Sequence, residues 1–133
     1  MKTFYLTTTL PYVNAAPHVG FALEIVQADV LVHYWKSIGR EGFFTTGTDE
    51  HGQKLFEASK KAGKEPQEYV DEFAAKFREL KEKLGLSEDL HFIRTTDARH
   101  IEAAQEIWRH ASPRVILRSA PTKGSIAWEM RHL

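Results

Sequence analysis

The start of the chain contains an aromatic, β-branched segment, a turn rich in proline and glycine, and an apolar pattern of helical period, in that order. Residues 4–9 have the composition of a short buried strand. The residues that follow include Pro11, Pro17 and Gly20, which restrict or free the backbone where a strand turns sharply into a helix. Apolar residues then recur every three or four positions. The pattern predicts a strand over 3–9, a turn over 10–20 and a helix over 21–38.

The strand-then-helix order repeats along the chain. Residues 42–48 are short, apolar and bounded by glycine, as in a central parallel strand, and residues 91–94 form a third apolar run. Strand, helix and strand within so short a length predict a parallel crossover unit. An apolar stripe between Pro66 and Gly85 has helical spacing, so we expect it to pack on the sheet rather than to bind a partner. The stripe comprises Tyr69, Val70, Phe73, Ala74, Phe77, Leu80 and Leu84, and further helices are expected over 53–62 and after Asp97, which would cap the last one.

Composition and charge limit the class of protein. A chain of 133 residues forms one domain at most, and 42% hydrophobic with 27% charged residues is ordinary for a soluble globular protein. The formal net charge is zero, with +3 on the last 23 residues, so the remainder is no basic nucleic-acid platform. Without cysteine, neither a disulfide nor a thiolate zinc site can form. Because no membrane-spanning run or signal-peptide pattern occurs, we expect a cytoplasmic protein.

His18 stands where the first helix is expected to begin. The amide groups of a helix start carry partial positive charge and point at the crevice above the strand, where open α/β sheets bind phosphates. His18 could donate a hydrogen bond at the same place and stabilise charge on a phosphate. A histidine at this position can equally be a surface or capping residue. Neither a dinucleotide-binding glycine motif nor a P-loop occurs in the chain.

Asp49, Glu50 and His51 directly follow the second predicted strand. The carboxyl ends of parallel strands lie at one edge of a sheet, so we expect these residues near His18. A carboxylate at this edge suits a cationic group such as the ammonium of an amino acid, and the other role open to Asp49 is the cap of the next helix. Glu50 and His51 offer two potential metal ligands without a third at suitable spacing, so we expect no protein-bound metal.

Residues 11–20 have the order Pro-Tyr-x-Asn-x-x-x-His-x-Gly. On a first strand–helix turn, this order resembles the HIGH signature of the class I aminoacyl-tRNA synthetases, which binds ATP during amino-acid activation. The resemblance implies an α/β fold, the first half of a Rossmann-like parallel sheet with flanking helices. The signature is His18-Val19-Gly20-Phe21 in this chain, with Phe21 in place of the second histidine. The loss of one such donor lowers a catalytic rate by about a hundredfold or more.

Four separated segments narrow the resemblance to the methionyl-tRNA synthetases. They occur in the order of that family, which is more specific than a single short motif. The resemblance covers about residues 3–110 and stops from about Ala111. The segments are 7–14 (TTTLPYVN), 24–29 (EIVQAD), 46–54 (TGTDEHGQK) and 92–97 (FIRTTD), the last followed by His100.

The resemblance implies substrates and site residues. The family attaches methionine to tRNA through methionyl-adenylate, and the protein mainly positions the reactants and stabilises charge. ATP, methionine and tRNA are therefore the implied partners, with Mg²⁺ held by the ATP phosphates. His18 is the implied catalytic residue. The residues implied for ATP binding are Asn14, His18, Gly20 and Phe21, and those implied for methionine binding are Leu10, Tyr12 and Asp49.

Residues 1–110 resemble only the N-terminal half of the family's catalytic domain, whereas residues 111–133 show no clear pattern. In a shifted frame, the possible codons of the tail permit the start of the family's connective domain, so one hypothesis is a frameshift near codon 111 and the other a diverged natural tail. We expect a methionine–tRNA ligase fragment that is inactive alone. The alternative is a non-catalytic half-fold with residual ATP or methionine binding. A leucine, isoleucine or valine synthetase fits residues 46–54 less well, and a generic nucleotidyltransferase that shares the His-x-Gly turn is disfavoured further.

Overall fold

The computed structural model describes residues 3–111. Within this part of the chain, one helix follows β1, three helices follow β2 and one helix follows β3. The chain divides into two compact units, with the boundary between Asp97 and Ala98. The elements are β1 (Thr3–Thr7), α1 (Val19–Ser37), β2 (Glu41–Thr48), α2 (Gln53–Ala62), α3 (Pro66–Arg78), α4 (Leu80–Lys83), β3 (Leu90–Arg94) and α5 (Ala98–Ala111).

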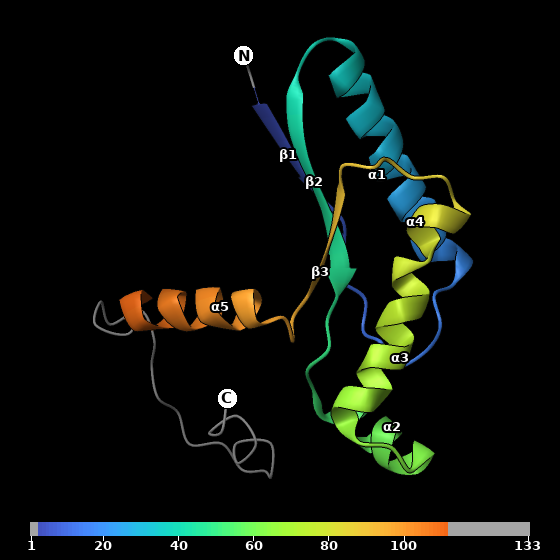
Figure 1. The fold of residues 1–133 in the computed structure, drawn as a ribbon, viewed down its shortest axis with the longest axis vertical. Coiled ribbons are helices and arrows are strands. Elements are labelled where there is room, and N and C mark those ends of the chain that lie inside the picture. Colours follow the sequence, from blue (N-terminus) through green and yellow to red (C-terminus); the bar gives the residue numbers. More distant parts are fainter. Residues whose placement is uncertain (1–2, 112–133) are drawn as a thin grey trace. The chain divides into compact units, whose positions relative to one another are not determined.

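The strands form one parallel sheet in the order β1-β2-β3, with β2 in the centre (Figure 1). Thr7 pairs with Thr45, and Thr46 pairs with Phe92. The β1–β2 pairing continues beyond β1, because the Thr8 N–H donates to the Thr45 carbonyl oxygen at 3.2 Å. The carboxyl ends of all three strands therefore lie at one edge, and the predicted parallel α/β sheet is confirmed.

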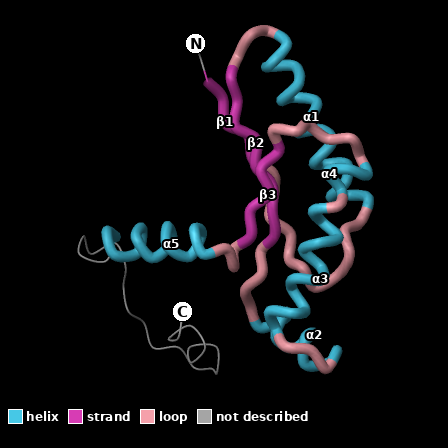
Figure 2. The backbone as a smooth tube through the Cα atoms, in the orientation of Figure 1, coloured by secondary structure: helices cyan, strands magenta, loops and turns pink. Residues whose placement is uncertain are grey.

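Helices α1, α3 and α4 lie on one side of the sheet, and α2 lies beyond the carboxyl ends of the strands (Figures 1 and 2). Ile25 and Val32 of α1 are each 1% exposed, and Phe44 of β2 is fully buried. Alternate residues of a strand point to opposite faces, and Tyr5 and Phe43 stack on each other on the exposed face. The side covered by helices carries the core of this unit, whose buried members are Val13, Phe21, Ile25, Ala28, Val32, Phe44, Leu55, Tyr69, Val70, Phe77, Leu86 and Leu90.

The helix predicted after Pro66 has one irregular residue. Glu79, between α3 and α4, keeps a right-handed helical backbone (φ −60°, ψ −21°), and its N–H donates to the Ala75 carbonyl oxygen at 3.0 Å. The chain therefore follows one helical path through Glu79. In the predicted stripe, Tyr69, Val70, Ala74 and Phe77 are buried and Phe73 and Leu80 pack against the core, but Leu84 is 38% exposed, so its prediction was wrong.

The second unit is described only by α5. Its Ile107 and Trp108 side chains are exposed. Asp97, the predicted cap of α5, accepts a hydrogen bond from the Arg94 N–H at 2.9 Å and so closes the turn that follows β3. The predictions for the tail, including the frameshift hypothesis, lie from residue 112 onwards outside the described residues. Within residues 3–111, no helix has the length and apolar character needed to cross a bilayer.

Gly47→Ala should destabilise the sheet more than Gly42→Ala. A Cβ at position 47 would overlap the carbonyl oxygen of Ile93, so β2 and β3 would have to separate. A Cβ at position 42 would overlap the ring of Phe4, which can turn away. We expect Gly47→Ala to lower the free energy of unfolding by about 3 kcal/mol and Gly42→Ala by about 1 kcal/mol, measured by urea denaturation. Equal losses would contradict this account of strand spacing.

Candidate functional site

The two segments predicted to form the site run side by side. The Asp49 N–H donates to the Pro11 carbonyl oxygen at 3.0 Å, and Tyr12 and Asp49 form a parallel bridge. This pairing extends the β1–β2 contact past the ends of both strands. Leu10 and Asp49 are half-buried and Tyr12 is 55% exposed. The structure therefore brings the three residues predicted for methionine binding together at the carboxyl edge of the sheet.

His18 is the N-cap of α1. Its backbone is extended (φ −111°, ψ 169°), and its Nδ1 accepts a hydrogen bond from the Gly20 N–H at 3.0 Å. A neutral imidazole that accepts at Nδ1 carries its proton on Nε2. The capping role considered from the sequence is thus present, and it leaves an exposed ring with a donor at the start of a helix.

Gly20 and Phe21 serve the packing of the protein itself. A Cβ on Gly20 would lie 2.9 Å from Cε1 of His18, so glycine leaves room for the capping ring. Phe21 is 6% exposed and packs edge-on against Phe77, with ring centroids 5.3 Å apart. A phenyl ring gains free energy from burial in the core. The Phe21 ring therefore lies in the core, and the predicted contact of this residue with ATP stays a prediction.

The turn between β1 and α1 is held from both sides by residues that sequence reasoning missed. Glu24 of α1 accepts hydrogen bonds from the N–H and the hydroxyl of Thr9, both at 2.8 Å. The Tyr69 hydroxyl of α3 donates to the Asn14 carbonyl oxygen at 3.3 Å. Asn14 itself is exposed, so its main chain anchors the turn while its side chain remains at the surface.

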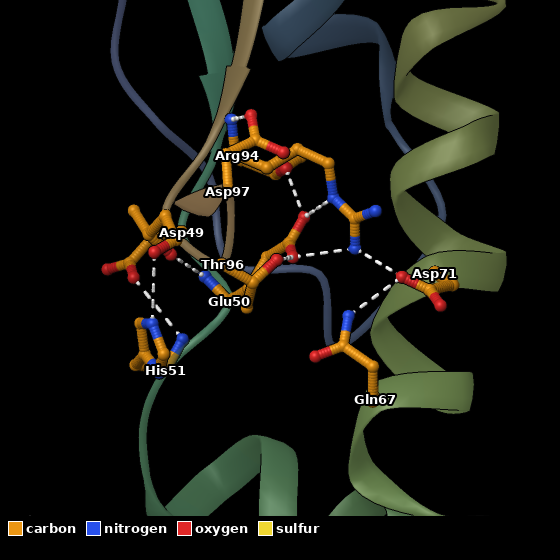
Figure 3. A network of polar contacts seen from close by, with 10 residues as sticks. Asp49, Glu50, His51, Gln67, Asp71, Arg94, Thr96 and Asp97 are labelled. Carbon is orange, nitrogen blue, oxygen red and sulfur yellow. Dashed lines mark hydrogen bonds and ion pairs between the residues drawn. The ribbon is translucent and has the colours of Figure 1, made fainter. Parts of the chain in front are cut away.

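Glu50 is the centre of a buried network, and its role was also missed. Its side chain is fully buried, and Arg94 donates to both carboxylate oxygens, from Nε and Nη2, each at 2.7 Å. The Thr48 hydroxyl donates to Oε1 at 2.6 Å and the Thr96 hydroxyl donates to Oε2. The guanidinium also reaches Asp71 of α3 (Figure 3). The network links the end of β2, the turn after β3, and α3.

The network fixes the charge of its members. Burial raises the pKa of Glu50, but hydrogen bonds from Arg94, Thr48 and Thr96 outweigh burial, so this pKa lies below its ordinary value. The hydrogen bond to Glu50 raises the pKa of Arg94, and the hydrogen bond from Arg94 lowers the pKa of Asp71. Glu50 is therefore a structural anion and not a general base poised near neutral pH.

The residues considered as metal ligands have other partners. Glu50 is occupied by the network, and Nε2 of His51 is hydrogen-bonded to the Thr95 carbonyl oxygen at 3.2 Å. In the part of the chain that the structure describes, no group of three or more histidine, aspartate or glutamate side chains is arranged to hold a metal ion.

Comparison with known proteins identifies the family. The family model described as tRNA synthetases class I (M) matches residues 4–128. The chain belongs to this family. A methionine–tRNA ligase of Thermotoga maritima is 48% identical over 103 residues, which make up 77% of this chain and 16% of the relative. A methionine–tRNA ligase of Rhizobium meliloti is 47% identical over 105 residues, or 79% of this chain and 20% of the relative.

A solved structure of this synthetase family is similar in fold. Methionyl-tRNA synthetase of Mycobacterium tuberculosis, in complex with methionyl-adenylate, has a TM-score of 0.81 and 42% identity over 85% of this chain and 22% of that chain. The resemblance found in the motifs and the class I Rossmann-like fold are both confirmed. The chain spans about a fifth of the length of the relatives that it matches.

Acid should weaken the fold in part through Glu50. The pKa of Glu50 is lower in the folded state than its ordinary value of 4.5. The ionised Glu50 carboxylate therefore stabilises the fold fully above pH 4.5, and this stabilisation is lost as the pH falls through the lowered pKa of the folded state. We expect Glu50→Gln to lower the free energy of unfolding by about 3 kcal/mol near neutral pH and by less in acid. Urea denaturation over a range of pH measures this, and a pH-independent cost would contradict a buried anion.

Proposed function

We propose that this chain forms part of the amino-acid activation site of a methionine–tRNA ligase and binds methionine and ATP at the carboxyl edge of its sheet. Activation joins the methionine carboxylate to the α-phosphate of ATP and releases pyrophosphate, before transfer to tRNA. The observation that carries the proposal is the pairing of Tyr12 with Asp49, which puts an acidic side chain beside an apolar and aromatic turn. The names of the relatives and the methionyl-adenylate in the mycobacterial structure support it.

The methionine half of the site would consist of Asp49, Leu10 and Tyr12. The Asp49 carboxylate would accept charge-assisted hydrogen bonds from the ammonium group, and its partial burial would strengthen them. Leu10 and Tyr12 would supply apolar and aromatic contacts to the thioether side chain.

The ATP half would be built on the start of α1. The Nε2–H of His18 would donate to a phosphate oxygen, because Nδ1 is occupied by the Gly20 N–H. The positive end of this 19-residue helix would favour the same negative charge. Charge that develops on the phosphates during activation would be stabilised by these donors. Asn14, in the same turn, would contact the nucleotide through its exposed side chain, and Gly20 would let the backbone approach the nucleotide closely.

The remaining partners follow from the same proposal. Mg²⁺ would be held by the ATP phosphates, since residues 3–111 offer no cluster of metal ligands. The acceptor would be tRNA, and the compartment would be the cytoplasm. A half-fold that binds methionine or ATP without turnover is the second candidate, and the burial of Phe21, where the family signature has a histidine, favours it.

Methionine binding tests the role of Asp49. When L-methionine is titrated into the chain and followed by amide NMR, we expect shifts at Leu10, Tyr12 and Asp49. Asp49→Asn should weaken binding about tenfold or more, because a hydrogen bond to a charged group is lost. Asp89→Asn, beside the amino end of β3, is the matched control and should bind normally. Absence of shifts would refute the site. Binding without methionine-dependent ATP–pyrophosphate exchange would support the non-catalytic candidate.

His18→Asn separates capping from phosphate binding. Asparagine caps helices well, so the free energy of unfolding of the His18→Asn variant should change by less than about 0.5 kcal/mol. His18→Ala should lower the free energy of unfolding by about 1 kcal/mol. Both variants lack the Nε2 donor, so both should weaken ATP binding about tenfold in a titration. Unchanged ATP affinity in both variants would exclude His18 from the nucleotide site.

A further inference from the structure

The backbone at Asp49 is held from two sides. On one side, the Asp49 N–H donates to the Pro11 carbonyl oxygen at 3.0 Å. On the other, the N–H of the next residue, Glu50, donates to the Thr95 hydroxyl at 2.8 Å. The Thr95 N–H in turn donates to the Thr48 carbonyl oxygen at 3.2 Å. The segment after β2 is therefore fixed between the turn before α1 and the turn after β3.

The Glu50 side chain adds the strongest part of this attachment. Figure 3 shows the Glu50 carboxylate on the side of Arg94, with the Asp49 carboxylate directed the other way. The bidentate pair with the Arg94 guanidinium restricts both the distance and the orientation of the Glu50 carboxylate. Arg94 is only 17% exposed and also contacts Asp71, so the guanidinium is itself fixed to α3. The position of Glu50 is thus set by packed elements, and its neighbour has little freedom to move.

We propose that Glu50 is a positioning residue of the methionine site: through Arg94 and the threonines after β3, it fixes the Asp49 backbone so that the Asp49 carboxylate faces the turn that holds Leu10 and Tyr12. This inference rests on the proposed role of Asp49 in binding methionine. Glu50 touches no substrate in this scheme. Glu50 restricts the Asp49 backbone before methionine binds, so less conformational entropy is lost on binding.

A residue that only stabilises the fold would behave differently. Loss of global stability speeds hydrogen exchange of all core amides together, whereas loss of a local attachment speeds exchange of the attached amides alone. The Asp49 N–H reports the local attachment, and the amides of Phe44 and Thr46 in the middle of β2 report the whole sheet.

Hydrogen exchange on the Glu50→Gln chain is the first experiment. Glutamine keeps the shape of the side chain, and Arg94 keeps Asp71 as a partner, so the variant retains a charged pair. The loss of global stability expected for this variant will speed exchange at Phe44 and Thr46, and we expect exchange at the Asp49 N–H to rise about tenfold beyond that, because its local attachment is lost as well. Equal rises at all three amides would overturn the proposal.

Two further variants make the result specific. Thr95→Val removes the acceptor of the Glu50 N–H while it keeps the pair with Arg94, so it should raise Asp49 exchange selectively and serves if Glu50→Gln does not fold. Glu79→Gln removes a carboxylate from an exposed pair with Lys83 and should leave Asp49 exchange unchanged. A selective rise in the Glu79 variant, or none in the Thr95 variant, would overturn the proposal.

A double-mutant cycle with L-methionine links positioning to binding. Glu50→Gln should weaken methionine binding about tenfold when Asp49 is present, and less than about twofold in the Asp49→Asn background, because the two residues act through one contact. An equal loss in both backgrounds would overturn the proposal. If the unmodified chain does not bind methionine, the proposed function fails, while hydrogen exchange still decides whether Glu50 fixes Asp49.

Discussion

The parallel pairing of β2 with a strand on each side determines where Asp49 lies relative to the turn before α1. Parallel strands end at the same edge, so β2 carries Asp49 to the place where the chain also turns from β1 into α1. The pairing continues past the strands through the hydrogen bond between Asp49 and Pro11. The β1–β2 register and this one hydrogen bond beyond it are therefore enough to bring Asp49 next to Leu10 and Tyr12.

The buried ion pair of Glu50 with Arg94 lies beside this edge, and nearby hydrogen-bond donors offset the cost of its burial. Burying a charge costs free energy unless it is paired and its remaining hydrogen-bonding capacity is filled. Arg94 and two threonine hydroxyls supply four hydrogen bonds to the Glu50 carboxylate. Such a pair adds little net stability compared with apolar packing, but these four hydrogen bonds restrict the orientation of the Glu50 carboxylate. The Glu50–Arg94 pair is adjacent to Asp49, whose carboxylate must be held in place to bind an ammonium group.

The turn before α1 combines capping with exposure. His18 uses Nδ1 to satisfy the Gly20 amide, and this fixes which nitrogen carries the proton. The same glycine is needed so that the ring fits above the first turn. The two readings of His18, as a cap and as a phosphate donor, are therefore compatible, because each uses a different ring nitrogen.

The sequence by itself determined the order and type of the elements, the parallel sheet and the family. These properties depend on local composition, periodicity and ordered motifs, which a single chain displays directly. The parallel strand order also predicted that Asp49 lies at the edge where β1 turns into α1, and the resemblance to the family added Leu10 and Tyr12 to the same site. The burial of Phe21, the attachment of Thr9 by Glu24, and the pairing of Glu50 with Arg94 were decided by the tertiary structure. Each depends on which side chain of a distant element lies opposite, and spacing along the chain does not contain that information.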